Sequence, residues 1–159
     1  MSAHKKSWRE KLEEDKGFPK VFKIDASKRK RWGTGMFVIP APKEVNDLMR
    51  RVKKGKLTTI DDLRKVLARR HGATMACPVT TGIFAWIAAH AAAEGEAAGE
   101  RNSTAFWRTL KSGGELNPKY PGGIEMLRVR LNAEGNSVKA KGKRFFVEGY
   151  EKRLAELGS

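Results

Sequence analysis

Hydrophobic side chains recur every three or four residues in two segments of the first half of the chain. The first segment follows Pro42, which suits the first turn of a helix, and ends at Gly55. Its hydrophobic positions are Val45, Leu48, Met49 and Val52. The second follows Thr59, a good N-cap with Asp62 three residues later, and ends near Gly72. Its hydrophobic positions are Ile60, Leu63, Val66 and Leu67. This spacing predicts two amphipathic helices.

A third helical segment begins at Pro78 and is rich in alanine. Its larger residues recur on one side, which we expect to face the core. These residues are Val79, Ile83, Trp86, Ile87 and His90. Only the short segment 73–77 separates this helix from the previous one. Two helices joined by a short turn are typical of a helix-turn-helix, although helical domains that never touch DNA share the pattern.

The second half of the chain alternates turn-rich segments with one more helix and a basic hairpin. Residues 94–103 indicate a polar loop, residues 104–111 a strand and residues 124–133 a helix. The run KAKGKR at residues 139–144 is typical of a hairpin tip, and a short terminal helix is expected after it. A basic hairpin beside a helix-turn-helix indicates a wing. We therefore predict a mainly α fold with a small β wing, a winged helix-turn-helix.

The first forty residues have weak periodicity and indicate a basic extension. A short helix is expected near residues 8–14, and residues 33–40 favour a strand. The run KRKRW at residues 28–32 can lie along phosphates, or it can be an ordinary solvated segment. The predicted organisation is an extension at 1–40, a DNA-binding domain at 41–135, and a basic hairpin and terminal helix at 136–159 packed on that domain.

The charge of the chain indicates what kind of partner it binds. The chain has 33 Lys and Arg against 18 Asp and Glu, a net charge of +15. Residues 49–72 hold nine basic and two acidic side chains, whereas residues 73–135 hold six of each. Such an excess suits a polyanion, because each neutralised phosphate releases counterions. An anionic membrane surface or the ribosome would suit the same charge, and so would a need for solubility alone. We expect double-stranded DNA as partner and no membrane.

Several other classes are disfavoured by residue content. The single cysteine, Cys77, excludes an internal disulfide and fits a reducing compartment. The polar N-terminus is not typical of a secretory signal, and the apolar stretch at residues 82–93 is too short to span a membrane. The three histidines lack metal-ligand spacing, and the glycine turns lack the Lys and Ser/Thr of phosphate loops. We expect a cytoplasmic protein, associated with the nucleoid in a bacterium, without cofactor or metal.

Six motifs in order carry a family resemblance. They are the run KGKLTT at 54–59, the helix at 61–70, the helix that follows Pro78, the run AFWRT at 105–109, the SGG turn at 112–114, and PGG at 121–123 leading into a helix that ends in LNAEG. Residues 43–135, a little under 60% of the chain, thereby resemble the DNA-binding domain of the O6-alkylguanine-DNA alkyltransferases and their alkyltransferase-like relatives.

The resemblance implies a winged helix-turn-helix that enters the minor groove and turns a damaged guanine into a pocket. Enzymes of the family accept the alkyl group on the cysteine of a Pro-Cys-His-Arg-Val motif. Here Phe106 stands at the cysteine's position and Trp107 at that of the histidine, and neither can do this chemistry. Ile60 replaces the family's flipping tyrosine, and Gly82 stands where the arginine finger is expected. Both replacements remove contacts used for base flipping.

Candidate site residues follow from the charge and from the resemblance. The DNA-binding candidates are Lys53, Lys54, Lys56, Thr58, Thr59, Pro78, Thr80, Thr81, Gly82, Arg108, Lys111, Gly122 and Gly123. The candidates for a base pocket are Ile60, Phe106 and Trp107. The two aromatic rings could stack on an unpaired base or could pack in the core, and the core is favoured for Phe106. No catalytic or metal-binding residue is expected.

These observations predict a non-enzymatic DNA-binding protein of the alkyltransferase-like type, acting in DNA repair or in recognition of alkylated DNA. Downstream repair proteins are further candidate partners. The alternative is a nucleoid-associated or transcription-regulating protein without lesion recognition. A third hypothesis, an alkyltransferase that uses Cys77, is less favoured because Cys-Pro is not the family's motif, although a helix N-terminus lowers a thiol pKa.

Overall fold

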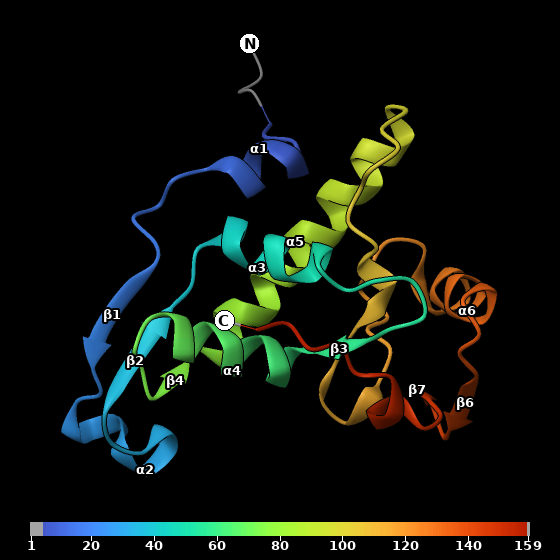
Figure 1. Cartoon of the computed structure of the whole chain (residues 1–159). Helices are drawn as coiled ribbons and strands as arrows, with labels where there is room; N and C mark the ends of the chain where they lie inside the picture. The colour runs from blue at the N-terminus through green and yellow to red at the C-terminus, as the bar shows by residue number, and fades with distance from the viewer. Residues whose placement is uncertain (1–4, 159) are drawn as a thin grey trace.

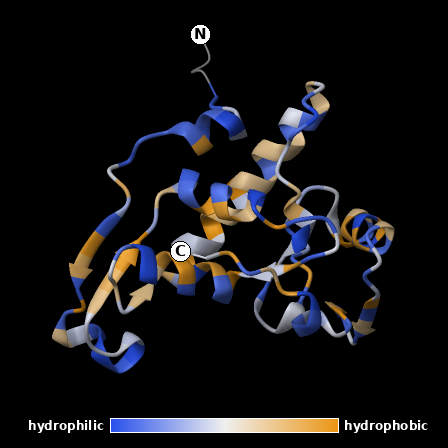
Figure 2. Cartoon of the chain, viewed as in Figure 1, coloured by the Kyte–Doolittle hydropathy of each residue, from blue (hydrophilic) through white to orange (hydrophobic). Residues whose placement is uncertain are grey.

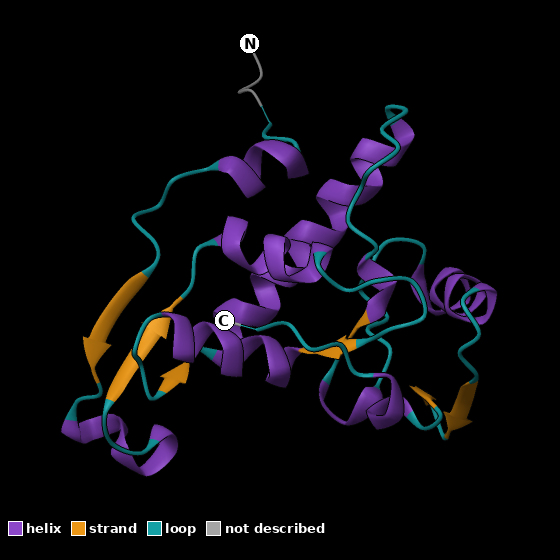
Figure 3. Cartoon of the chain, in the orientation of Figure 1, coloured by secondary structure: helices purple, strands orange, loops and turns teal. Residues whose placement is uncertain are grey.

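The computed structural model describes residues 5–158 (Figures 1 and 3). The α-helices are α1 (Trp8–Glu13), α2 (Arg29–Trp32), α3 (Pro42–Arg50), α4 (Ile60–Arg70), α5 (Pro78–Ala97) and α6 (Gly123–Ala133). The strands are β1 (Lys20–Lys23), β2 (Met36–Ile39), β3 (Thr58–Thr59), β4 (Met75–Ala76), β5 (Thr109–Leu110), β6 (Val138–Lys141) and β7 (Arg144–Val147). The short 3-10 turns are η1 (Ala26–Lys28), η2 (Phe106–Arg108), η3 (Ser112–Gly114) and η4 (Tyr150–Arg153).

Helix α5 forms the centre of the molecule, and α1, α3 and α4 pack against it (Figure 1). Figure 2 shows that α5 is mostly pale orange and that β1, β2 and α4 carry strongly hydrophobic residues, whereas α2 is mostly hydrophilic. The buried side of α5 is built mainly from alanines, among them Ala85, Ala88 and Ala89, and these small side chains let the other helices approach closely. The main core adds Leu48, Leu63 and other large residues of α3 and α4.

The predicted helix caps are present. The hydroxyl of Thr59 accepts a hydrogen bond from the backbone N–H of Asp62 at 3.2 Å and starts α4. Pro42 occupies the first turn of α3, and Pro78 begins α5. Helices α4 and α5, with the turn at 71–77 between them, therefore form the predicted helix-turn-helix.

Two residues of that turn, Met75–Ala76, form β4, which belongs to a small sheet. Strand β2 lies at the centre of the order β1-β2-β4, antiparallel to β1 and parallel to β4. The backbone N–H of Cys77 donates to the Val38 carbonyl at 2.9 Å, directly before α5 begins. A second buried cluster, Ile24, Phe37 and Cys77, covers this sheet. The N-terminal strands are thus joined to the start of α5.

The basic hairpin near the C-terminus has the predicted form. Strands β6 and β7 pair antiparallel with Lys141 opposite Arg144, and Val147 is buried against the core. The expected terminal helix is only the 3-10 turn η4, after which the chain runs extended beside Leu57. Figure 1 shows this wing at the lower right, at the opposite end of the molecule from α2.

Several of the local predictions were wrong. Residues 94–97, expected in a polar loop, form the end of α5. Residues 104–111 were expected to form a strand, but η2 occupies Phe106–Arg108 and only Thr109–Leu110 is extended, because Thr109 and Leu110 pair with the two-residue strand β3. The side of α5 expected to face the core was also wrong in its first turns. Val79 and Ile83 are exposed there, and Thr81, Phe84 and Ala85 are buried instead. In this part of the helix the core side carries Phe84 with the smaller Thr81 and Ala85.

Candidate nucleic-acid interface

A cleft of about 700 Å³ lies where the helix-turn-helix meets the wing. It is bounded by the start of α4, the first turns of α5, the segment from Lys111 to Lys119, and β7. Its lining residues are Ile60, Asp61, Arg64, Pro78, Val79, Gly82, Ile83, Trp86, Lys111, Ser112, Glu115, Asn117, Lys119 and Arg144. Four predicted site residues, Ile60, Pro78, Gly82 and Lys111, therefore come together in one concave surface.

The floor of this cleft is apolar and open to solvent. Val79 is 55% exposed and Ile83 is 44% exposed, although both are hydrophobic side chains on a helix that packs in the core. Pro78 precedes them, and the half-buried Trp86 lies one turn beyond Ile83. Neighbouring exposed apolar residues in a concave site are typical of a binding surface rather than of ordinary solvated helix.

Cations surround that floor. Arg64, Lys111, Lys119 and Arg144 line the cleft, against the acids Asp61 and Glu115. Glu115 lies 2.7 Å from an Arg144 nitrogen and 3.8 Å from Lys111 Nζ, and the hydrogen bond from Arg144 lowers its pKa although burial opposes this. Two positive charges therefore face one ionised carboxylate, which leaves this wall of the cleft with an excess of positive charge.

The wing continues this basic wall. Lys139 pairs with Phe146 and Lys141 pairs with Arg144 across the hairpin, so the side chains of these residues share one face. Arg144 also lies over the Phe146 ring at 5.1 Å. Because Arg144 lines the cleft, the exposed Lys139 and Lys141 extend its positive charge along the wing.

Gly82 is not required by the backbone conformation or by close packing, unlike the other glycines of the chain. Fourteen of the sixteen glycines have a positive φ, which favours glycine over other residues. Of the remaining two, Gly95 is crowded by the side chains of Glu100 and Ser103. A Cβ built on Gly82 would meet no heavy atom within 4 Å. Its missing side chain therefore widens the cleft beside Val79 and Ile83 without being required by the fold.

An aromatic cluster on α5 holds one wall of the cleft. Trp86 Nε1 donates to the Lys119 carbonyl at 3.2 Å, and His90 Nε2 lies 3.1 Å from the same oxygen. A carbonyl only accepts, so Nε2 of His90 carries its proton in this contact. Trp8 of α1 stacks on the His90 ring at 4.4 Å between centroids. The sequence pattern had placed Trp86 and His90 toward the core and gave no signal for their contact with Lys119.

Helix α1 is held on α5 by a side chain from α5 itself. The carboxylate of Glu94 accepts hydrogen bonds from the backbone N–H groups of Trp8 at 3.0 Å and Arg9 at 2.9 Å. These bonds, with the Trp8 bond acting most strongly, hold the pKa of Glu94 below its ordinary value although burial opposes them. The N-terminal helix therefore supports the aromatic cluster behind Lys119.

The motif at 105–109 does not reach the cleft. Phe106 is buried in the core, edge-on to Tyr120. Trp107 Nε1 donates to Glu134 at 3.1 Å, and the Arg130 guanidinium lies 4.3 Å from its ring centroid. Arg108 is likewise turned to the interior, where it binds Glu134 and the Val52 carbonyl. Of the three base-pocket candidates, only Ile60 lines the cleft.

Three of the four threonine candidates are buried and cannot contact a ligand at the surface. Thr58, Thr59 and Thr81 are each almost fully buried, and the Thr81 hydroxyl donates to the Cys77 carbonyl at 2.6 Å. Their side chains hold β3 and the starts of α4 and α5 instead. Thr80 is partly exposed, although its hydroxyl oxygen is buried without a hydrogen-bond partner among the described residues.

The other candidates lie outside the cleft. Gly122 is the N-cap of α6 and has a left-handed conformation, and Gly123 is the first residue of the helix. The lysines Lys53, Lys54 and Lys56 are exposed on the loop between α3 and β3, and no acidic partner for them is found within residues 5–158. A backbone hydrogen bond from Gly55 to Glu134 places this loop beside the end of α6.

Cys77 does not line the cleft either. It is 6% exposed, packs with Ile24 and Phe37, and its sulfur accepts from the Thr80 N–H at 3.4 Å at the start of α5. No group of three His, Cys, Asp or Glu side chains able to hold a metal occurs in the part of the chain that the structure describes. His4 lies outside that part. Within the same limits, no helix has both the length and the apolar character needed to cross a bilayer.

Comparison with known proteins places this geometry on a known fold. A similar solved structure is the crystal structure of S. pombe Atl1 in complex with damaged DNA containing O6-carboxymethylguanine. The two chains are 15% identical with a TM-score of 0.50, and the similarity covers 72% of this chain and 94% of the Atl1 chain. At this identity the likeness is one of fold, and it confirms the mainly α fold with a small β wing. No protein-family model and no curated protein matches the sequence.

Proposed function

We propose that the chain is a DNA-binding protein that recognises damaged, alkylated DNA by binding rather than by reaction. The observation that carries the proposal is the cleft between α5 and the wing, with an apolar floor and a basic wall, on a fold similar to that of Atl1 bound to damaged DNA. Phosphates suit the wall formed by Lys111, Lys119 and Arg144, whereas Val79 and Ile83 suit the apolar face of a base.

The proposal includes no chemical step. Among the described residues that line the cleft there is no cysteine, histidine or other nucleophile paired with a base. Cys77, the residue before α5, is buried with Ile24 and Phe37 and does not line the cleft. The remaining predicted contacts, Lys53, Lys54 and Lys56 above all, belong to the proposal as backbone contacts outside the cleft. Alanine at all three should reduce the salt dependence of DNA binding.

The test compares a duplex that contains one O6-methylguanine with the same undamaged duplex, by fluorescence anisotropy over a range of salt concentrations. We expect binding to both, with salt-dependent affinity, and tighter binding to the damaged one. Equal affinities would leave DNA binding in place and remove lesion recognition. Failure to bind either duplex in dilute buffer would remove the proposal.

A pair of matched variants tests whether the cleft is the site. Val79→Glu places a carboxylate on the cleft floor, at an α5 position where the helix dipole favours an acid. Val129→Glu makes the same change on α6, where Val129 is 56% exposed and outside the cleft. We expect about tenfold weaker DNA binding for Val79→Glu, since about 1.4 kcal/mol of repulsion is a factor of ten, and little change for Val129→Glu.

A second function is favoured by one observation. Neither Phe106 nor Trp107 lines the cleft, and Ile60 and Gly82 offer no polar group to a base. A nucleoid-associated or transcription-regulating protein would use the same basic surface without lesion recognition. The duplex comparison separates the two functions, because only damage recognition requires the affinities to differ.

A further inference from the structure

The N-terminal strand and helix carry a group of exposed cations. Between residues 20 and 32 the basic side chains are Lys20, Lys23, Lys28, Arg29, Lys30 and Arg31, and all six are exposed. Within residues 5–158, none of them has a carboxylate oxygen within 4.0 Å. The one acid of this segment, Asp25, accepts from the Ser27 N–H at 3.0 Å as the cap of η1.

These cations stand on a folded platform rather than on a loose tail. We call residues 20–39 the N-terminal platform. Trp32 stacks on Phe37 with 4.6 Å between ring centroids, and Phe22 packs on Phe37 at 5.2 Å. Lys28 and Arg31 lie over the Trp32 ring at 5.2 and 5.4 Å. Cations held in this way lose less conformational entropy when they bind than cations on a mobile chain.

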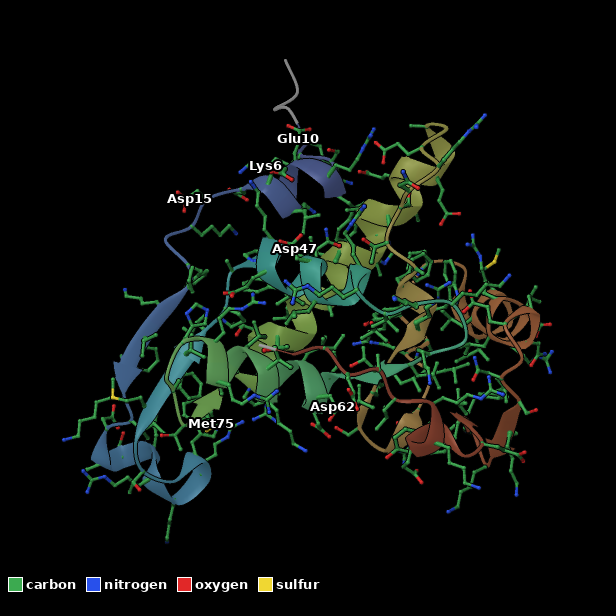
Figure 4. The ribbon with its side chains drawn as sticks, in the orientation of Figure 1. Lys6, Glu10, Asp15, Asp47, Asp62 and Met75 are labelled. Atoms are coloured by element: carbon green, nitrogen blue, oxygen red, sulfur yellow. The ribbon has the colours of Figure 1, made fainter. Side chains whose placement is uncertain are left out.

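The platform is fixed to the helix that bounds the cleft. Its strand β2 is hydrogen-bonded to β4, with Thr74 N–H donating to the Met36 carbonyl at 2.9 Å. Strand β4 lies in the turn of the helix-turn-helix, and only Cys77 separates it from α5. Figure 4 shows Met75 of β4 beside the platform and Asp62 at the start of α4. The cations therefore hold a set position relative to the cleft.

We infer that the N-terminal platform is a second contact for the phosphate backbone of DNA, beyond the footprint of the cleft. The inference rests on the proposed function, because it takes duplex DNA as the partner. Figure 1 shows α2 and the wing on either side of α4, and both elements carry exposed cations. A duplex that spans both ends releases more counterions than one that reaches the cleft alone.

The experiment measures the dependence of affinity on salt for an undamaged duplex, with three forms of the full chain. The first is the wild type. The second is the platform variant Arg29→Ala, Lys30→Ala, Arg31→Ala, which keeps Trp32 and good helix formers. The third is a matched control, Lys5→Ala, Lys16→Ala, Arg101→Ala, which removes the same charge from exposed positions elsewhere.

We expect the slope of log affinity against log salt to fall by about 2 to 3 in the platform variant, since each lost phosphate contact is worth about 0.9. The control should change the slope by less than about one contact. The loss in the platform variant should also grow with duplex length, and should vanish for a duplex too short to reach past the cleft.

The outcomes separate the two proposals. If the wild type ignores duplex DNA, the proposed function fails. If the wild type binds but the platform variant and the control have equal slopes, the inference fails while the proposed function stands. Should the platform variant not fold, as judged by circular dichroism, the charge reversals Lys20→Glu and Lys23→Glu on β1 make the same test. These must weaken binding to a long duplex more than to a short one.

Discussion

The guanidinium of Arg108 binds the carboxylate of Glu134 through two nitrogens, with Nε 2.9 Å from Oε1 and Nη2 2.5 Å from Oε2. The same guanidinium donates from Nη1 to the Val52 carbonyl at 2.8 Å. The side chains are only 14% and 7% exposed. Arg108 therefore joins the end of α3, the end of α6 and the segment at 105–109, and its guanidinium is engaged within the fold.

Removal of Arg108 should destabilise the fold. Arg108→Ala removes the cation paired with the buried Glu134 carboxylate, which keeps only its bonds from Trp107 and Gly55, and leaves the Val52 carbonyl without this donor, so we expect a loss of about 3 kcal/mol in the free energy of unfolding. Urea denaturation followed by circular dichroism measures it. Arg128→Ala is the matched control, because Arg128 pairs with Glu125 on the exposed face of α6 and such pairs contribute little. Equal losses for the two variants would contradict the prediction.

The same pair predicts a pH dependence. Burial acts to raise the pKa of Glu134, but the hydrogen bonds from Arg108 and Trp107 outweigh it, so its pKa lies below the ordinary 4.5. Its contribution to stability is therefore complete above the ordinary pKa and is lost as the pH falls through the lowered value. We expect Glu134→Gln to destabilise the protein at neutral pH and to flatten the decline in stability below about pH 4.5. A parallel decline in both proteins, measured by urea unfolding, would refute this.

Much of the fold could be predicted because its signals are local. The start of a helix depends on the residues of its first turn. Thr59 caps α4 at Asp62, Pro42 begins α3 and Pro78 begins α5, so all three helices begin as expected. The segment at 104–111 could not be predicted, because a strand pattern says nothing about whether a partner strand is long enough. Only the two-residue strand β3 is available there, so Phe106 and Arg108 turn inward.

The site was harder to predict than the fold. Val79 and Ile83 were expected in the core because large apolar residues usually are. The buried side of α5 consists mainly of alanines, and these small residues give little periodic signal in the sequence. Lys119 and Arg144 reach the cleft from segments far away in the sequence, so no local pattern could join them to Ile60. The charge excess indicated a polyanion without saying which cations share a surface.

Cys77 should be unreactive in the folded protein. Its sulfur is buried between Ile24 and Phe37, and a thiol has to be exposed and ionised to react. We expect modification by a soluble aromatic disulfide to be on the order of a hundredfold slower in the native protein than in urea, because it waits for local opening. Fast modification of the native protein, or alkylation of Cys77 after incubation with O6-methylguanine DNA, would restore the enzyme hypothesis. Mass spectrometry detects both.

The substitution Gly82→Ala adds one methyl group and should change both the stability of the fold and the affinity for DNA. A glycine inside a helix costs about 0.5 to 1 kcal/mol relative to alanine, and a Cβ at Gly82 meets no heavy atom within 4 Å. Gly82→Ala should therefore raise the free energy of unfolding by about this amount. If DNA approaches α5 most closely at this point of the cleft, the added methyl group should at the same time weaken DNA binding severalfold.

The control is the same substitution at Gly95, near the other end of α5. Gly95 also lies in α5, but a Cβ there would come closer than 3.0 Å only to the flexible end of the Glu100 side chain, which can move aside, so the fold should tolerate Gly95→Ala. Since Gly95 is far from the lining of the cleft, the affinity of the folded variant for DNA should stay as in the wild type. Weaker DNA binding of Gly82→Ala alone would show that the position in the cleft matters, and not a Gly→Ala change in α5 as such. A Gly82→Ala protein that is more stable and binds DNA unchanged would mean that the duplex does not approach this floor.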